Sequence, residues 1–239
     1  MNLLLLEPQH WLNDDQALIQ DERAKHAFQI LKLSAGDCIT LGQLGGNVGF
    51  GRVAEINQEQ LKIEDIKLNT LPPPALPLTL ILGMPRPQML KRILQTVATM
   101  GLTRLCLIQS SRVEKSFWQS PSATEAAIRA QLILGLEQGM ATQLPEVQYF
   151  RRFRPFIEDE LTSIAADTQR LIAHPVADFS VDQAKTNQPT TLAIGPEGGF
   201  LDPEVERFRE AGFDSVHIGS RILKVETAVP VLLAKLYQC

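Results

Sequence analysis

Short apolar runs separated by turn residues dominate the first 70 positions of the chain. The turns are Ser34-Ala35-Gly36-Asp37 and Leu44-Gly45-Gly46-Asn47, in which glycine, asparagine and aspartate favour chain reversal. One segment, residues 21–33, instead places its apolar residues on one broad helical face. The pattern predicts a small β-barrel with one helix, whose strands are Leu3–Leu6, Cys38–Leu41, Val48–Ile56 and Leu61–Ile66.

The segment Leu71-Pro72-Pro73-Pro74-Ala75-Leu76-Pro77 interrupts this pattern. Its prolines cannot continue a helix or a central strand, and they favour a stiff, extended linker. We therefore expect two domains, residues 1–70 and residues 76–239.

After the linker, apolar runs typical of buried strands alternate with helical patterns. Such alternation predicts an α/β domain with a mostly parallel sheet that is covered on both faces. The expected strands are 78–82, 104–108, 170–173, 191–194 and 215–218. The expected helices are 88–100, 123–138, 153–166, one that begins at the N-cap Asp202, and a last one from about Thr227.

Composition narrows the class of protein. No run of apolar residues approaches the length of a membrane helix, and the run Leu3–Leu6 is too short for a signal sequence, so a cytoplasmic location is the expectation. Cys38, Cys106 and Cys239 form no Cys-x-x-Cys pair, so neither a disulfide framework nor a metal site is expected.

The formal net charge of −4 argues against a protein that coats nucleic acid without specificity. It leaves room for a local basic patch that reads one folded RNA, and it equally allows each basic cluster to be a solvated face. The clusters are Arg86, Lys91 and Arg92, then Arg151, Arg152 and Arg154, then Arg221 and Lys224.

A glycine-rich loop follows the expected strand 191–194. It reads Gly195-Pro196-Glu197-Gly198-Gly199, and its glycines allow a ligand to approach the bare backbone. A phosphate is disfavoured there because Glu197 would repel it, whereas a cation, an amine or a hydroxyl donor suits the loop. The alternative is a tight turn whose Glu197 is merely exposed.

A second loop follows the expected strand 215–218 and carries Gly219, Arg221, Lys224 and Glu226 before the last helix. Its residues Ile222, Leu223 and Val225 are too apolar for an ordinary exposed loop, so they line a pocket or a subunit contact. Glu226 has a second interpretation as a first-turn acid favoured by the helix dipole. Two such loops at the carboxyl ends of parallel strands predict a ligand site.

Together, Ile-Gly-Pro-Glu-Gly-Gly-Phe at 194–200 and Gly-Ser-Arg-Ile-Leu-Lys-Val-Glu-Thr-Ala at 219–228 resemble the signature of the RsmE family. The segment His26-Ala27-Phe28-Gln29-Ile30-Leu31-Lys32 is similar to the His-x-x-x-Val-Leu-Arg stretch of the same family. The resemblance implies an S-adenosylmethionine-dependent methyltransferase that acts on N3 of a uridine in small-subunit ribosomal RNA. It further implies a SPOUT (α/β-knot) domain at 76–239, an RNA-binding PUA-like barrel at 1–70, and a homodimer.

The resemblance also implies roles for single residues. Arg221 and Glu226 would be the catalytic residues. Arg221 would stabilise the uracil anion, and Glu226 would either accept the proton or orient Arg221. RNA would be bound by His26, Lys32, Arg86, Lys91 and Arg92. The cofactor would contact Ala173, His174, Ile194, Gly195, Pro196, Glu197, Gly198, Gly199, Ile218, Gly219, Ser220, Ile222, Leu223, Thr227 and Ala228.

Three other functions stay open at this point. A nucleotide-binding oxidoreductase is disfavoured because residues 82–85 lack a Gly-x-Gly-x-x-Gly pattern and because Glu197 opposes a phosphate. A non-catalytic RNA-binding protein in ribosome assembly would keep the same scaffold. A SPOUT methyltransferase with a different RNA target would keep the cofactor loops and change the RNA-binding residues.

Overall fold

The computed structural model describes residues 2–237, so Cys239 and the last two positions of the expected second domain lie outside the described residues. Contacts divide the chain into two units. The first unit comprises residues 1–74 and 133–144, and the second comprises residues 75–132 and 145–239. The segment 133–144 belongs to the first unit although the sequence pattern placed it with the second.

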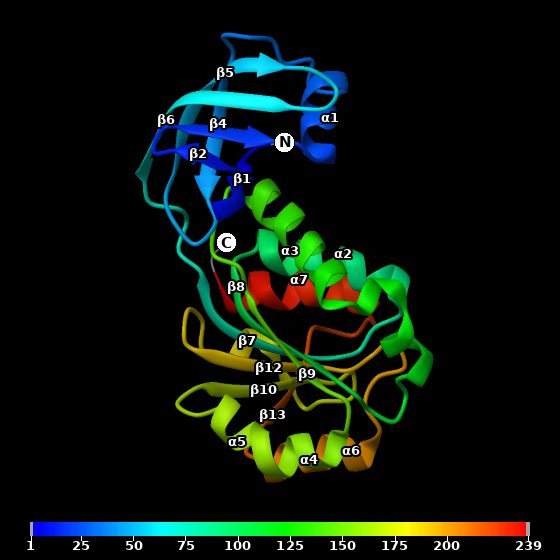
Figure 1. The fold of residues 1–239 in the computed structure, drawn as a ribbon. Coiled ribbons are helices and arrows are strands. Elements are labelled where there is room, and N and C mark those ends of the chain that lie inside the picture. Colours follow the sequence, from blue (N-terminus) through cyan, green and yellow to red (C-terminus); the bar gives the residue numbers. More distant parts are fainter. Residues whose placement is uncertain (1, 238–239) are drawn as a thin grey trace. The chain divides into compact units, whose positions relative to one another are not determined.

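The described part of the first unit is built on a curled, mixed sheet with the strand order β1-β4-β5-β6-β3-β2 (Figure 1). Strands β1 and β4 pair in parallel, and the other pairs are antiparallel. The curl is that of a half-barrel. The elements are β1 (Leu4–Leu6), η1 (Pro8–His10), β2 (Trp11–Asn13), β3 (Gln16–Ile19), α1 (Glu22–Gln29), β4 (Cys38–Gln43), β5 (Val48–Ile56) and β6 (Leu61–Thr70).

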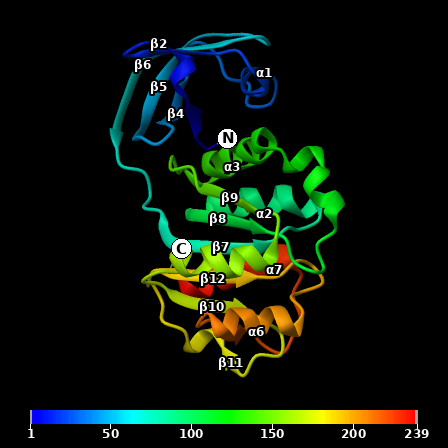
Figure 2. The ribbon, with the colours of Figure 1, turned by 60° about the horizontal axis from the view of Figure 1, so that its bottom comes forward.

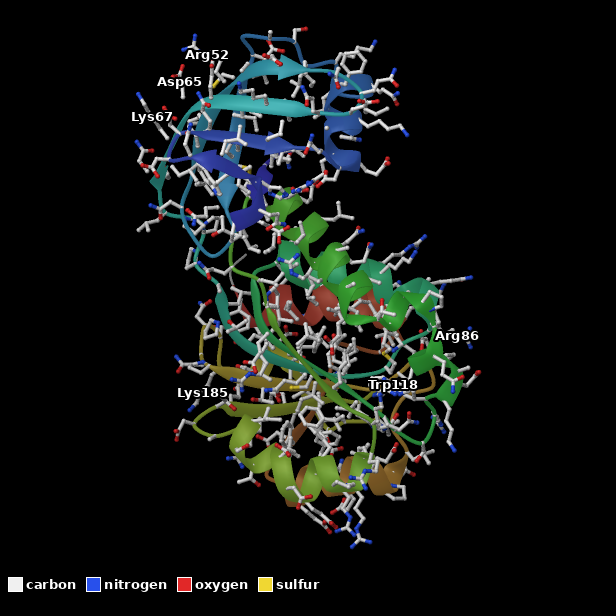
Figure 3. All side chains as sticks on the ribbon, viewed as in Figure 1. Arg52, Asp65, Lys67, Arg86, Trp118 and Lys185 are labelled. Atoms are coloured by element: carbon white, nitrogen blue, oxygen red, sulfur yellow. The ribbon has the colours of Figure 1, made fainter. Side chains whose placement is uncertain are left out.

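The core of this unit lies inside the curl, where Leu4, Leu41 and Ile63 from three strands pack with Ala24 and Ala27 of α1. Helix α1 is capped by the Asp21 carboxylate, which accepts a hydrogen bond from the Arg23 amide. On the outer side of the sheet, Arg52 and Asp65 form an ion pair of 3.0 Å (Figure 3).

The segment 133–144 is held to β1 and to the turn that follows β4 by polar contacts. The amide of Leu5 donates to Oε1 of Glu137 at 3.1 Å. The Thr142 hydroxyl donates to the carbonyl of Gly46 at 2.6 Å, and the Gly45 amide donates to the carbonyl of Thr142 at 2.8 Å. These long-range bonds explain why the segment joins the first unit.

The second unit contains a sheet whose described strands are all parallel, in the order β11-β13-β10-β12-β7-β8-β9 (Figure 2). The strands are β7 (Leu76–Gly83), β8 (Leu102–Ile108), β9 (Glu146–Phe150), β10 (Gln169–Ala173), β11 (Phe179–Ser180), β12 (Thr190–Ile194) and β13 (Asp214–His217). The remaining elements are α2 (Pro87–Thr99), η2 (Lys115–Gln119), η3 (Pro121–Ala123), α3 (Glu125–Gly139), α4 (Phe153–Pro155), η4 (Phe156–Glu160), α5 (Leu161–Ile164), η5 (Val181–Gln183), α6 (Asp202–Glu210) and α7 (Val225–Leu236).

Helices cover both faces of this sheet, as the alternation of strands and helices predicts (Figure 1). On one face α7 packs with α2. On the other, Phe156 and Phe208 from the helical segments of 153–164 and 202–210 pack against Ile81, Cys106 and Ile172 of the sheet. The described parallel strands therefore lie between two helical layers, and the carboxyl ends of such strands are where a ligand site of an open α/β sheet forms.

Several expected boundaries are wrong by a few residues, each for a local reason. Helix α1 ends at Gln29 rather than near Leu33, because Lys32 adopts a left-handed φ of 54° and the Leu33 amide turns back to the Ala27 carbonyl. The N-cap of α6 is Leu201 rather than Asp202. The Glu204 carboxylate accepts from the Leu201 amide at 2.8 Å and so starts the helix one residue earlier.

The expected helix 153–166 is interrupted by the π-helical turn η4. Strands β2, β3 and β9 were not expected, because they are short and only partly buried. Across residues 2–237, no helix combines the length and the apolar character that crossing a membrane requires.

Candidate functional site

The site lies where β13, β10 and β12, three neighbouring strands, reach their carboxyl ends. A pocket of about 250 Å³ opens there and is lined by Ala173, Ile194 and His217 from the strand ends and by residues of the two loops that follow β12 and β13. This is the edge at which parallel sheets bind ligands. The two motifs that are separate in the sequence thus face one another across one pocket.

The first loop, residues 195–200, is shaped by close backbone contacts. The Gly199 amide donates to the Pro196 carbonyl at 2.7 Å, and Gly199 takes a φ of 74°. A Cβ atom on Gly195 would lie 2.7 Å from the Phe200 amide nitrogen, so only glycine fits there. The loop therefore has a single tight conformation that presents bare backbone to the pocket.

Glu197 lies on the pocket wall and has a defined partner. Its Oε1 accepts a hydrogen bond of 2.9 Å from the backbone amide of Arg86, at the N-cap of α2. The carboxylate is thus anchored to the loop after β7. Its other oxygen is the one that a hydroxyl or amine of a ligand could reach.

The second loop, residues 218–224, exposes its apolar residues. Ile222 is 82% exposed although it is a large aliphatic residue, and it lines the pocket together with Leu223 and Arg221. Gly219 has a φ of 153° at the start of the loop. Helix α7 then begins at Val225, two residues before the expected Thr227, so Glu226 lies in its first turn.

Most of the residues predicted for the cofactor and for catalysis line this one pocket. Glu226, Ser220 and Thr227 do not. The three lining residues that the sequence analysis did not name are Pro175, Val216 and His217. The predicted residues in the lining are Ala173, His174, Ile194, Gly195, Pro196, Glu197, Gly198, Gly199, Ile218, Gly219, Arg221, Ile222, Leu223 and Ala228.

His217 is the most informative of the missed residues. Its Nδ1 atom is buried and has no hydrogen-bond partner among the described residues. A buried polar atom without a partner is costly, so this atom is one that a ligand in the pocket could satisfy by a hydrogen bond. The sequence signal was weak, because a histidine in the last position of a strand is also an ordinary core residue.

Arg112 is a second residue that the sequence analysis missed. It follows β8, and its guanidinium donates to the carbonyl of Gly198 in the first loop. The buried carboxylate of Glu204 supports this segment, since it accepts from the Ser111 amide at 2.8 Å and from the Leu201 amide at 2.8 Å. Arg112 thus adds a positive charge at the rim of the first loop.

The residues predicted to bind RNA are divided between the units. Arg86, Lys91 and Arg92 lie at the N-cap and in the first two turns of α2 (Arg86 is labelled in Figure 3). His26 lies on α1, and Lys32 lies at the left-handed turn that follows this helix. Arg151 belongs to another basic cluster of the sequence. Within the second unit, its guanidinium carbon lies 5.4 Å from the ring centroid of Trp118, which is a cation–π contact.

Comparisons with known proteins point to one family. The family model described as "RNA methyltransferase domain" matches residues 72–237. The chain is 30% identical over 232 residues to the ribosomal RNA small subunit methyltransferase E of Treponema pallidum, covering 95% of this chain and 87% of the relative. It is 25% identical over 219 residues to a methyltransferase E of Borreliella burgdorferi, covering 88% and 87% of the two chains.

Solved structures show the same fold. The methyltransferase E of Neisseria gonorrhoeae, solved with bound S-adenosylmethionine, superposes with a TM-score of 0.76 at 20% identity, covering 98% of this chain and 95% of that one. A Legionella pneumophila protein solved with the same bound cofactor gives a TM-score of 0.79 at 20% identity, covering 98% of this chain and 96% of that one. At this identity the likeness establishes the fold.

Proposed function

The chain belongs to the RsmE family of small-subunit ribosomal RNA methyltransferases, which have the SPOUT fold, and from this membership we propose that it methylates N3 of a uridine in 16S-type RNA with S-adenosylmethionine as the methyl donor. One observation carries the proposal. The two motif loops, which follow β12 and β13 and are separate in the sequence, line a single pocket at the ends of three adjacent parallel strands.

The pocket fits the cofactor by three features of this chain. Backbone amides and carbonyls of the glycine loop can bind the edge of an adenine, and Ile194, Ile218 and Leu223 offer apolar contacts to its faces. Buried Nδ1 of His217 is available to a polar group of the ligand. Glu197 offers a carboxylate oxygen to a ribose hydroxyl or to the amino group of the methionine moiety. When bound, S-adenosylmethionine supplies an electrophilic methyl group.

The residues of the chain prepare the uridine for this chemistry. N3 of uridine bears a proton and becomes a good nucleophile only when that proton is removed, which leaves negative charge on the uracil carbonyls. Arg221 lines the pocket and is exposed, so its guanidinium can approach these carbonyls and stabilise the charge. Glu226, half-buried in the first turn of α7 and outside the pocket lining of one chain, is proposed either to accept the proton through a water or to orient Arg221.

The test separates binding from chemistry. We expect Arg221→Ala and Glu226→Gln each to lower kcat by about 10²-fold or more, the size of effect seen when a charge-stabilising donor or a general base is removed. Isothermal titration should show the dissociation constant of S-adenosylmethionine within about threefold of the wild-type value, because neither side chain is among the groups proposed to bind the cofactor. Wild-type turnover in either variant would remove that residue from the mechanism.

We also propose a homodimer whose contact lies beside the site. Ile222 and Val176 are 82% and 81% exposed, and both are large aliphatic residues that a subunit contact would bury. Ser220 and Thr227 do not line the pocket of one chain. A second copy of the chain would then complete the part of the site that contains them. Light scattering of the active protein tests this, and an active monomer would contradict it.

A further inference from the structure

A second cavity lies within the first unit, between α1 and the segment 133–144. This α1/α3 groove has a volume of about 510 Å³. One wall is α1, with Lys25, His26 and Ile30, and the other is the second half of α3, with Leu134, Glu137 and Gln138. The volume falls in the range typical of small-molecule sites.

The floor of the groove holds a buried acid. Glu137 is only 4% exposed, and burial raises the pKa of its carboxyl group, although the Leu5 amide and Arg23 oppose this rise. Its Oε1 accepts from the Leu5 amide at 3.1 Å and from Nη1 of Arg23 at 3.5 Å. Both hydrogen bonds described for this carboxylate within residues 2–237 end on Oε1, so Oε2 is the oxygen that a ligand in the groove would meet.

Arg23 is itself committed to the protein. It binds both carboxylate oxygens of Asp21 at 2.7–3.1 Å, donates to the Leu5 carbonyl at 2.8 Å, and lies 3.1 Å from Nε2 of His10. This network fixes the position of Glu137 before any ligand arrives. A polar group held in this way recognises a ligand at low entropic cost.

The walls and the rim have a different character from the floor. Ile30 is 66% exposed and Leu134 is 47% exposed, so two aliphatic side chains face solvent on opposite sides of the cavity. Beside them lie His26 and the ammonium of Lys25, which pairs at 3.7 Å with the exposed carboxylate of Glu22 in the same lining. An apolar slot with an acceptor at its floor and nitrogen donors at its rim matches a flat ring with an amino group that is attached to a phosphate.

We propose that the α1/α3 groove binds one unstacked nucleotide of the RNA substrate, and that its base carries an exocyclic amino group. The amino group of adenine, cytosine or guanine would donate to Oε2 of Glu137. The base would lie between Ile30 and Leu134, and its phosphate would approach Lys25 and His26. Uracil has no such amino group, so the nucleotide in the groove differs from the uridine that is methylated.

This inference rests on the proposed function in one respect, namely that the ligand belongs to an RNA. The first test does not depend on methyl transfer. Full-length protein with labelled Ile and Leu methyl groups is titrated with CMP and with UMP, which differ by an amino group against a carbonyl at position 4 of the ring and by the proton that uracil carries on N3. We expect CMP to shift the methyl resonances of Ile30 and Leu134, and UMP to bind about tenfold more weakly, the discrimination that one base contact gives. Equal binding of CMP and UMP overturns the proposal, and so does the absence of a shift with each of CMP, AMP and GMP at about 10 mM, which would mean a binding free energy weaker than about −2.7 kcal/mol.

The second test uses a matched pair of exposed leucines in the same unit. Leu134→Ser removes a groove wall, whereas Leu12→Ser changes a leucine of similar exposure, 53%, that is not part of the groove lining. We expect Leu134→Ser to raise the KM for small ribosomal subunits about tenfold with kcat unchanged, and Leu12→Ser to leave both unchanged. Equal KM values in the two variants overturn the proposal. If the wild-type protein transfers no methyl group, the proposed function fails, and the comparison of CMP with UMP still decides the groove.

Discussion

Gly83 ends strand β7, and the space that its missing side chain leaves is filled by the first loop of the site. A Cβ atom at this position would lie 2.5 Å from Cδ and 2.6 Å from the nitrogen of Pro196, and 3.1 Å from the carbonyl carbon of Gly195. Gly83 is not part of the pocket lining. The substitution Gly83→Ala therefore tests whether packing behind the loop controls the site.

The size of the effect follows from these distances. Moving the Pro196 nitrogen from 2.6 Å to an ordinary contact of 3.4 Å displaces the loop backbone by about 0.8 Å. Overpacking of this kind costs about 1–3 kcal/mol of stability. A displacement near 1 Å in a positioning element costs about 10²-fold in rate. We therefore expect methyl transfer to fall about 10²-fold, equivalent to about 2.7 kcal/mol of activation free energy, while the protein loses about 1–3 kcal/mol of stability and stays folded.

Isothermal titration with S-adenosylmethionine and thermal unfolding measure the two effects separately. We expect at least about tenfold weaker cofactor binding, with the melting temperature lowered by about 2–12 °C. The control is Gly46→Ala in the first unit, whose added Cβ would lie no closer than 3.2 Å to any described atom beyond residues 45–47. The nearest of these is Cβ of Gln43, and none of the three nearest is a backbone atom. Wild-type affinity in Gly83→Ala, with the protein folded, would refute the idea that this packing positions the loop.

Two further predictions concern ionisation. Burial raises the pKa of Cys106 to about 12. Iodoacetamide at pH 8 should therefore alkylate the exposed Cys38 and spare Cys106 in the native protein, as measured by peptide mass mapping. Equal labelling of the two cysteines would contradict the burial of Cys106. Burial alone would raise the pKa of Asp21, but hydrogen bonds and charge from Arg23 lower it. The ionised carboxylate therefore stabilises the fold at pH values above 3.8, its ordinary pKa, and this stabilisation is lost as the pH falls below that value. Asp21→Asn, which keeps the helix cap, should therefore cost about 0.5–1 kcal/mol at pH 6, since the side chain is half-exposed, and progressively less as the pH falls below 3.8. A difference in urea unfolding that does not change with pH would contradict this.

Periodicity alone predicted the alternating architecture of the second unit, because buried parallel strands such as β7 and β12 are continuous apolar runs. It missed β9, in which every residue after Glu146 is only partly buried and no clear pattern results. It also could not assign residues 133–144 to the first unit. The bonds that do so, from Leu5 to Glu137 and from Thr142 to Gly46, join positions about a hundred residues apart and leave no local signal.

The part of the site that depends on the positions of glycines could be predicted from the sequence. Gly195 and Gly199 have conformations or contacts that other residues do not tolerate, and such positions are visible as a motif. His217 and Arg112 were not predictable, because each is one ordinary polar residue whose role depends on the neighbour that folding brings to it. For Arg112 this neighbour is the carbonyl of Gly198.

The central claim is that this chain places a methyl group on N3 of a small-subunit ribosomal uridine. Mass spectrometry of nucleosides from the small-subunit RNA of a deletion strain tests it most directly, with the wild-type gene and the Arg221→Ala gene returned separately. We predict that 3-methyluridine is lost on deletion, is restored by the wild-type gene, and is not restored by Arg221→Ala. An unchanged level of 3-methyluridine in the deletion strain would contradict the account.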